Sequence, residues 1–263
     1  MNLESSPLPS KPILLLMGTL FLWSCSPQDI SPIPAGSTQL ILVVSDSLQA
    51  STGSLTRFTR EPGGTWQQTD SPVVIVLGRN GLAWGRGLHE LNATMQPVKV
   101  EGDGCAPAGV FTLSTAFGYT HPDSMIGLKF PYIHNNEFLE CVDDIDSEYY
   151  ARVVYNDDVD SVDWTSSERM GHYGVWYAQG VVVEHNLDPV ISGAGSCIFL
   201  HNWSTPDETT SGCTEMEPKS LSELILWLDE VQNPVLVQLP LEWYLSSRSR
   251  WQLPQIDYSK GEQ

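Results

Sequence analysis

The sequence predicts a mainly β protein that folds as one domain, and three observations lead to this prediction. Its short apolar runs are β-branched or alternate with polar residues, and Gly, Pro, Asn and Ser separate them. Only two segments have the periodicity of helices. Once an apolar leader is set aside, the rest of the 263-residue chain has the length of a single domain. The 41% hydrophobic content with nine tryptophans is typical of a folded chain.

The leader is predicted to be a signal peptide over residues 1–25. Lys11 precedes the apolar run PILLLMGTLFL, which is long enough for a signal peptide and too short to span a bilayer. The run ends at Leu22-Trp23-Ser24-Cys25, which resembles the lipobox of bacterial lipoproteins and implies lipidation of Cys25. Ser26 replaces an inner-membrane retention aspartate, so the expected location is the periplasm, with a lipid anchor in the outer membrane. The alternative is an ordinary secretory signal that is cleaved nearby.

Residues 26–38 are rich in Pro and Ser and are predicted to form a short extended tether. The domain then covers residues 39–240, and residues 241–263 form a C-terminal extension. Seven strands are predicted in the domain, at 39–46, 54–61, 72–78, 109–114, 180–186, 196–201 and 234–240.

Two helices are predicted, at 165–173 and at 218–231. The second has Pro218 in its first turn, where proline is tolerated. Its apolar face consists of Leu221, Leu224, Ile225 and Leu228.

The charge of the chain limits its partners. Thirteen basic residues against 32 acidic ones give a formal charge of −19, which repels phosphate backbones and anionic lipid surfaces. Nucleic acid is therefore not expected as a partner.

His201 and Cys213 are the candidate catalytic pair. His201 ends the apolar run IFLH, and Cys213 follows the polar loop NWSTPDETTSG, which is able to fold back and bring the two side chains together. A thiol with a pKa of about 8.5 needs a base to act as a nucleophile, and histidine can supply it. The backbone N–H groups of Ser211, Gly212 and Cys213 are candidates for binding an oxyanion. The alternative is a buried histidine beside an inert cysteine.

These residues resemble the L,D-transpeptidase catalytic domain of the YkuD type. In that family a histidine closes a strand, and a Ser/Thr-x-Gly-Cys motif follows a variable loop, as IFLH and TSGC do here. A second segment, GDGCAPAGVFTL at 102–113, is similar to the family's Thr-Pro-x-Gly-x-Phe motif. The resemblance covers about 39–240 and implies a β-sandwich or barrel-like catalytic domain.

The resemblance also implies a chemistry. Cys213 would be the nucleophile, His201 the base, and a backbone carbonyl near Asn202 would orient the imidazole. The donor would be a peptidoglycan stem peptide, which forms a thioester on Cys213 and releases D-alanine before an amine of a second stem attacks. The first alternative is a carboxypeptidase or amidase that resolves the same thioester with water. Ser211, Thr214 and Glu215 depart from the residues common in the family, and the departures at Ser211 and Thr214 suggest the second alternative, an inactive peptidoglycan-binding lipoprotein.

Other candidate residues have weaker signals. Arg79 and Arg86, in the glycine-rich LGRNGLAWGRGLH, are candidates for binding a stem-peptide carboxylate or for a structural role in a bent loop. This segment lacks the Gly-Lys-Ser/Thr ending of a phosphate loop. His185 is a candidate for substrate binding or, alternatively, a satisfied histidine of the surface or core.

No cofactor or metal is predicted. The acidic NDDVDSVDW lacks the glycine and the final glutamate of an EF-hand, and indicates a solvated face or one that attracts cationic amines. If Cys25 is lipidated and Cys213 is the nucleophile, at most one disulfide forms among Cys105, Cys141 and Cys197, and the sequence does not select the pair.

Overall fold

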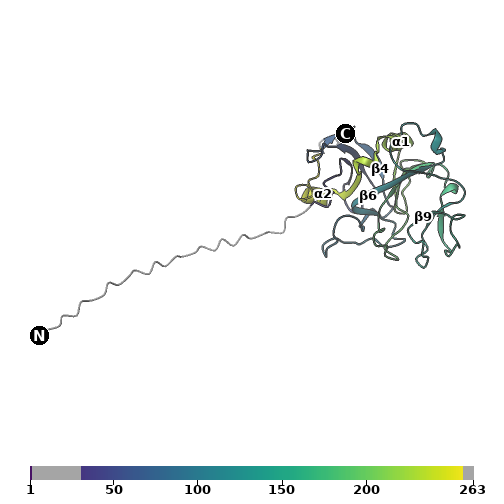
Figure 1. The fold of residues 1–263 in the computed structure, drawn as a ribbon, viewed down its shortest axis with the longest axis horizontal. Helices are drawn as coiled ribbons and strands as arrows, with labels where there is room; N and C mark the ends of the chain where they lie inside the picture. The colour runs from purple at the N-terminus through teal and green to yellow at the C-terminus, as the bar shows by residue number, and fades with distance from the viewer. Residues whose placement is uncertain (2–30, 257–263) are drawn as a thin grey trace.

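A computed structural model describes residue 1 and residues 31–256, and its centre is a closed eight-stranded β-barrel (Figure 1). The strands follow one another in the order β1-β14-β6-β11-β12-β13-β4-β2, and pairing of β1 with β2 closes the ring. The bounds are β1 (Gln39–Ser45), β2 (Thr52–Thr59), β4 (Val73–Val76), β6 (Ala106–Gly118), β11 (Gln179–Val183), β12 (Phe199–Asn202), β13 (Thr214–Met216) and β14 (Val235–Pro240).

Three short strands extend the barrel. β3 (Gln67–Gln68) pairs with β2, while β5 (Leu82–Trp84) and β7 (Tyr132–His134) pair with β6. The long strand β6 therefore joins four neighbours, β14, β11, β5 and β7. It carries the predicted motif segment with Pro107, Gly109 and Phe111 into the centre of the molecule.

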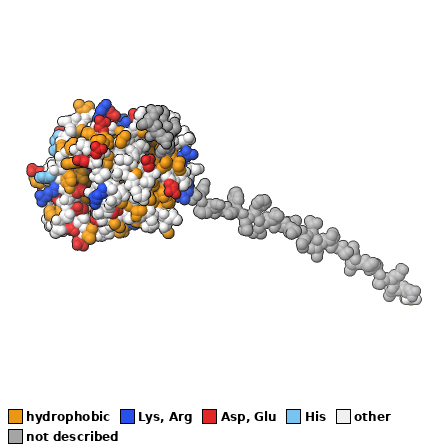
Figure 2. Space-filling view, turned by 180° about the vertical axis from the view of Figure 1, so that it is seen from behind, with side chains coloured by type: hydrophobic (Ala, Val, Ile, Leu, Met, Phe, Trp, Pro, Cys, Tyr) orange, Lys and Arg blue, Asp and Glu red, His pale blue; other side chains and the backbone are white. Residues whose placement is uncertain are grey.

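The barrel interior is a hydrophobic core formed by alternate residues of the strands. Val181, Leu200 and Met216 face it, and their neighbours in sequence face outward, as the two-residue period of a strand requires. Figure 2 shows acidic side chains spread among hydrophobic and polar ones on the outer surface in that view. None of the helices among the described residues is long and apolar enough to cross a membrane.

The segments flanking residues 39–240 pack on the same core. Helix α2 (Leu241–Ser247) contacts β1 and β14, and Tyr244, Trp251 and Leu253 are buried in the core cluster. Ile33, within the predicted tether, is buried there too. Apolar residues from the described parts of the predicted tether and of the C-terminal extension therefore complete the core of the domain.

Helix α1 (Pro218–Trp227) confirms the second predicted helix. Its predicted apolar face is buried, with Leu221, Leu224 and Ile225 inside the helix and Leu228 at its C-terminal cap. The helix ends before 231, and the single 3₁₀ turn Glu230–Gln232 follows it. It packs against β11 and β12, the strands that lead to the candidate site.

The helix predicted at 165–173 is wrong. Ser167–Arg169 form strand β10, and a 3₁₀ turn follows at Met170–His172. β10 pairs with β8 (Leu139–Val142), which pairs with β9 (Val153–Tyr155) in a separate antiparallel sheet. Cross-strand pairing with β8 outweighs a weak local preference, since Thr165, Ser166, Ser167 and Gly171 are all poor helix formers.

The small sheet packs on the outer face of the barrel, where Leu139 and Cys141 of β8 share a hydrophobic cluster with residues of β6, β11 and β12. A disulfide joins Cys141 of β8 to Cys197, just before β12, across 56 residues of chain. This second hydrophobic cluster fills the space between the two sheets and includes Phe117, Tyr177 and Phe199. The free cysteines of the described chain are Cys105 and Cys213, both buried.

The seven predicted strands all exist with shifted ends. β6 is the most extended, and β11 ends at Val183 because the chain turns at Asn186, whose φ is 57°. The sequence prediction did not include β13, which has only three residues. This omission matters because β13 begins directly after Cys213 and fixes where its side chain points.

Candidate active site

Strand register brings His201 and Cys213 to the same face of the barrel. β12 and β13 are parallel, with Leu200 opposite Thr214 and His201 opposite Glu215. Residues two apart in a strand share a face, so Cys213 lies on the side of Glu215 and of His201. This side faces outward toward the small sheet, because Leu200 and Met216 fill the barrel interior.

The backbone around Cys213 holds its thiol between two groups. The N–H of Phe199 donates to Sγ over 3.3 Å, and Sγ donates to the carbonyl oxygen of Cys197 over 3.4 Å. Cys197 has a φ of 52°, in the left-handed region, and belongs to the disulfide that attaches the small sheet. Cys197 therefore both attaches the small sheet that covers the site and accepts the hydrogen bond from the thiol of Cys213.

The imidazole of His201 is oriented by the backbone. Its Nδ1 lies 2.9 Å from the carbonyl oxygen of Asn202, which fixes the tautomer with the proton on Nδ1 and leaves Nε2 as the basic nitrogen. The ring packs edge-on against Tyr177, with 5.0 Å between the centroids. Asn202 is held in turn, because its side-chain amide donates to the carbonyl of Val175.

Burial keeps both members of the pair neutral at rest. It lowers the pKa of His201 to about 4, opposed only by the hydrogen bond to Asn202. It also raises the pKa of Cys213 well above its usual range, and the nearby carboxylate of Glu168 raises it further. The resting pair is thus a neutral thiol and a neutral imidazole.

The turn before Cys213 is fixed by Thr210. Its hydroxyl accepts from the N–H of Gly212 over 3.0 Å and donates to the carbonyl of Cys213 over 2.7 Å. Of the three N–H groups predicted to bind an oxyanion, that of Gly212 is thus already used, and those of Ser211 and Cys213 remain candidates. A side chain at Gly212 would lie 3.2 Å from the carbonyl oxygen of Cys105, so the turn has little room for one.

His201 and Cys213 open into a pocket of about 840 Å³ between the barrel and the small sheet. Its acidic side chains outnumber its basic ones, Arg79 and Lys99. The acidic ones are Glu101, Asp143, Glu168, Asp207, Glu208 and Glu215. Aromatic rings of Tyr173, Trp176 and Tyr177 complete one wall.

The two basic residues lie at the turn that carries Cys213. Arg79 donates to the hydroxyl of Ser211 over 3.1 Å, and the Nζ atom of Lys99 would be 3.6 Å from a Cβ atom placed on Gly212. Lys99 is almost fully buried and pairs with Asp103 over 2.8 Å. Sequence reasoning did not identify Lys99, because a single lysine among acidic residues has no motif.

Glu168 and Glu215 were also not identified as site residues from the sequence. Glu215 Oε1 lies 3.6 Å from His201 Nδ1, and burial followed by the charge of Glu208 raises the pKa of Glu215 to about 7. Glu168 accepts a hydrogen bond from Tyr177, and burial raises its pKa to about 7. The wrong prediction of a helix at 165–173 prevented the identification of Glu168, because its orientation toward the site follows from the pairing of β10 with β8.

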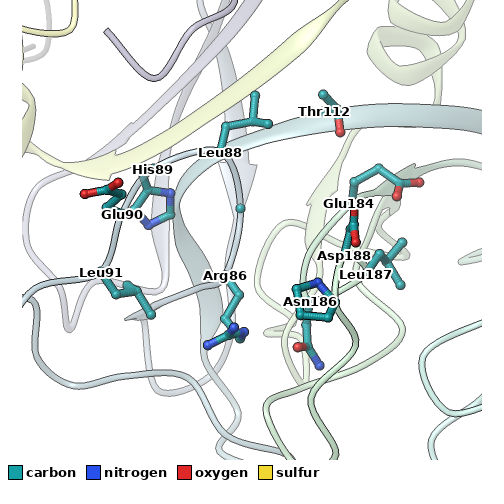
Figure 3. Close-up of a pocket in the computed structure, with 12 residues that line it drawn as sticks. Arg86, Leu88, His89, Glu90, Leu91, Thr112, Glu184, Asn186, Leu187 and Asp188 are labelled. Atoms are coloured by element: carbon teal, nitrogen blue, oxygen red, sulfur yellow. The ribbon is translucent and has the colours of Figure 1, made fainter. Parts of the chain in front are cut away.

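The structure does not bring Arg86 and His185 to this pocket. His185 is buried, accepts from the N–H of Arg86 at Nδ1 over 3.2 Å, and contacts the carbonyl of Ala194 through Nε2 over 3.0 Å. Arg86 lines a separate pocket of about 560 Å³, where Figure 3 shows it with Glu184 and Asp188 from the segment after β11. Only Arg79 of the three candidates for substrate binding lines the pocket of Cys213.

Thr214 and Cys25 complete the predicted positions. Thr214 points into the barrel, where its hydroxyl donates to Gln238 Oε1 over 2.8 Å. Cys25 lies outside the described residues.

No family model matches the sequence, and no curated protein is significantly similar to it. A proposal about function therefore depends on the fold and on the geometry of the site. What they define directly is a class of site: a covered thiol and an oriented imidazole on one face of a β-barrel. The resemblance to L,D-transpeptidases stays a prediction from the two motifs.

Proposed function

We propose that this protein is a peptidoglycan L,D-transpeptidase that acts through a thioester on Cys213. The observation that carries the proposal is the placement of Cys213 and His201 on one face of β12 and β13, with Nδ1 of His201 bonded to the Asn202 carbonyl. This arrangement leaves Nε2 free to accept the thiol proton without a carboxylate third member. It agrees with the roles that the motif resemblance implies.

In the first step, His201 Nε2 takes the proton of Cys213 while Sγ attacks the carbonyl carbon of the L,D-peptide bond of the donor stem. The carbonyl electrons move to oxygen, and we assign the stabilisation of this oxyanion to the N–H of Cys213 and to the cation of Lys99, whose Nζ atom would be 3.6 Å from a Cβ atom placed on Gly212. Collapse of this intermediate breaks the C–N bond. His201 returns the proton to the departing amine, so D-alanine leaves and a thioester remains on Sγ.

In the second step, an amine of another stem peptide attacks the thioester carbonyl. His201 removes a proton from the attacking nitrogen and returns it to Sγ as the C–S bond breaks. A new peptide bond forms, and the free thiol is restored. Water in place of the amine would give a carboxypeptidase with the same residues.

Arg79 and Lys99 support a donor that carries a carboxylate. They are the basic residues of the pocket and both lie at the turn before Cys213. A fixed cation beside the reacting carbonyl also stabilises the negative charge that develops there. Of the two arginines that were candidates for binding the stem-peptide carboxylate, we therefore assign this role to Arg79 and not to Arg86.

Incubation of the purified protein with cell-wall sacculi, followed by mass spectrometry of the muropeptides, tests the proposal. New crosslinks at the diamino acid would support a transpeptidase, and stems that are shortened but not crosslinked would support a hydrolase instead. An unchanged profile would contradict both and favour a binding protein.

We also propose that the protein is exported and anchored by a lipid on Cys25. The support is the Leu22-Trp23-Ser24-Cys25 boundary after the apolar run. The mature protein is then expected to partition into detergent, and Cys25→Ser is expected to abolish this partitioning. Wild-type protein recovered entirely in the soluble periplasmic fraction would contradict the anchor.

A further inference from the structure

The pocket of Cys213 has an acidic side that the proposed reaction does not use. On the small sheet, Glu168 of β10 lies opposite Cys141 of β8, and Asp143 follows Cys141 by two residues. These three residues therefore share one face. Because Cys141 is bonded to Cys197 of the barrel, this face is the one turned toward Cys213.

Glu215 lines the same pocket from the barrel. It is 4% exposed and shares the outward face of β13 with Cys213. Its Oε2 atom is buried and has no hydrogen-bond partner among the described residues, and the same holds for Oδ1 of Asp143. Buried carboxylate oxygens without donors are unfavourable, so each indicates that a donor is supplied from outside the chain.

The basic residues of the pocket do not supply these donors. Lys99 is paired with Asp103, and Arg79 is bonded to Ser211 in the turn that precedes β13. Glu101 is already bonded to Tyr150 and Ser196. Glu168, Asp143 and Glu215 are named here the acidic wall, and no lysine or arginine among the described residues forms an ion pair with any of the three.

We propose that the acidic wall binds a primary ammonium group of the substrate, such as the side-chain amine of the diamino residue in a stem peptide. An ammonium carries three donors and one positive charge, which suits carboxylate oxygens on two facing sheets. A metal ion fits less well, because no group of three or more ligating side chains among the described residues is arranged to hold one.

This inference rests on the proposed function for the identity of the peptide. It adds a selectivity that the Cys213 and His201 pair does not determine: substrates with a free amine next to the scissile bond bind, and those with a blocked amine do not. The carboxylate of the same ligand would lie toward Arg79 and Lys99, so the two ends of the pocket have opposite charges.

Calorimetry on the full chain with Cys213→Ala tests the inference, because this variant binds without turnover. The probes are a stem tetrapeptide with lysine at its third position and the same peptide acetylated on the lysine amine. We expect acetylation to weaken binding at least tenfold, since it leaves buried carboxylates unpaired. Adding Asp143→Asn or Glu168→Gln should reduce this difference, while Glu137→Gln, an exposed carboxylate outside the pocket, should not.

Equal affinity for the two peptides, or no binding of the lysine peptide, would overturn the inference, and this comparison requires no change in the acidic wall. The muropeptide assay separates this outcome from a failure of the proposed function. Crosslinking activity together with equal affinities would refute the acidic wall alone. Selective binding of the free amine without any wall-modifying activity would refute the transpeptidase and leave the ammonium site supported.

Discussion

His201 and His185 are both buried histidines at the ends of strand segments, and yet they belong to regions with different chemistry. Burial lowers the pKa of His201 to about 4 and that of His185 to about 3. Both ring nitrogens of His185 are bonded to backbone groups, from Arg86 and Ala194. In His201 the backbone bond is to Nδ1, and the ring borders the pocket that contains Cys213.

Burial and a low pKa are common to both histidines, so these two properties do not distinguish a candidate catalytic histidine from a structural one. A histidine with both nitrogens satisfied is a structural crosslink between segments. One with a single satisfied nitrogen and a thiol on its own face is positioned to transfer a proton. The predictions below test this contrast between the His201 region and the His185 region, from the largest expected effect to the smallest.

Cys213→Ala is expected to abolish turnover, because no other free thiol lines the described pocket. Mass spectrometry after exposure to a carbapenem, a mimic of the acyl donor in the resembled family, should find an adduct on the peptide containing Cys213 and none in the variant. Cys105→Ser is the matched control, since Cys105 is the other free cysteine and is also buried. Full wall-modifying activity in Cys213→Ala would disprove the mechanism.

His201→Ala is expected to lower kcat/KM by about 10²–10⁴, the usual contribution of a general base. His185→Ala should leave kcat/KM within a few-fold and lower the free energy of unfolding by about 1–3 kcal/mol, because it leaves buried backbone groups without partners. Steady-state kinetics and chemical denaturation of both variants measure the contrast. Equal losses of activity would show that the two regions are not functionally distinct.

Removing the disulfide tests the role of the small sheet, which covers the pocket of His201 and not the region of His185. The double substitution Cys141→Ser with Cys197→Ser should lower the free energy of unfolding by about 4 kcal/mol, from the loop-entropy relation for a crosslink over 56 residues. Binding of the lysine peptide should weaken as well, since Asp143 and Glu168 are held over the site by this bond. Unchanged stability in denaturant titrations, compared with Cys105→Ser, would contradict this role.

Glu215→Gln is expected to change how stability depends on pH. The pKa of Glu215 is raised to about 7 in the folded protein, so the folded state binds more protons than the unfolded state between about 4.5 and 7. Its contribution is therefore most favourable at low pH and is lost as pH rises through about 7, while His201 stays neutral over this range. The Tm of Glu215→Gln should exceed that of the wild type by more at pH 8 than at pH 5, by roughly a few degrees. A Tm difference that is constant across pH would contradict it.

The smallest expected effect is a difference in KM between Arg79→Ala and Arg86→Ala, which tests which of the two pockets binds the substrate. Arg79 lies at the turn before Cys213, so its loss should raise KM several-fold with little change in kcat, as expected for an exposed anchoring group. Arg86 lines the other pocket, and its loss should leave KM unchanged. A larger rise in KM for Arg86→Ala would reassign substrate binding to the pocket of Figure 3.

The sequence by itself determined the mainly β class, seven of the eight described strands that have four or more residues, the helix at Pro218 and the candidate pair His201 and Cys213. These features depend on local patterns, such as apolar alternation, a proline in a first turn and a motif with a fixed order. The resemblance to L,D-transpeptidases was available for the same reason, because its motifs are contiguous.

Tertiary structure alone decided which groups surround the pair. β10 was predicted as a helix because strand pairing with β8 is not visible in a three-residue window, and that error hid Glu168. The bond between Cys141 and Cys197 likewise depends on how the small sheet meets the barrel. Lys99, Asp143 and Glu215 come from segments far apart in sequence, and their shared pocket results from register and sheet packing, which no local pattern encodes.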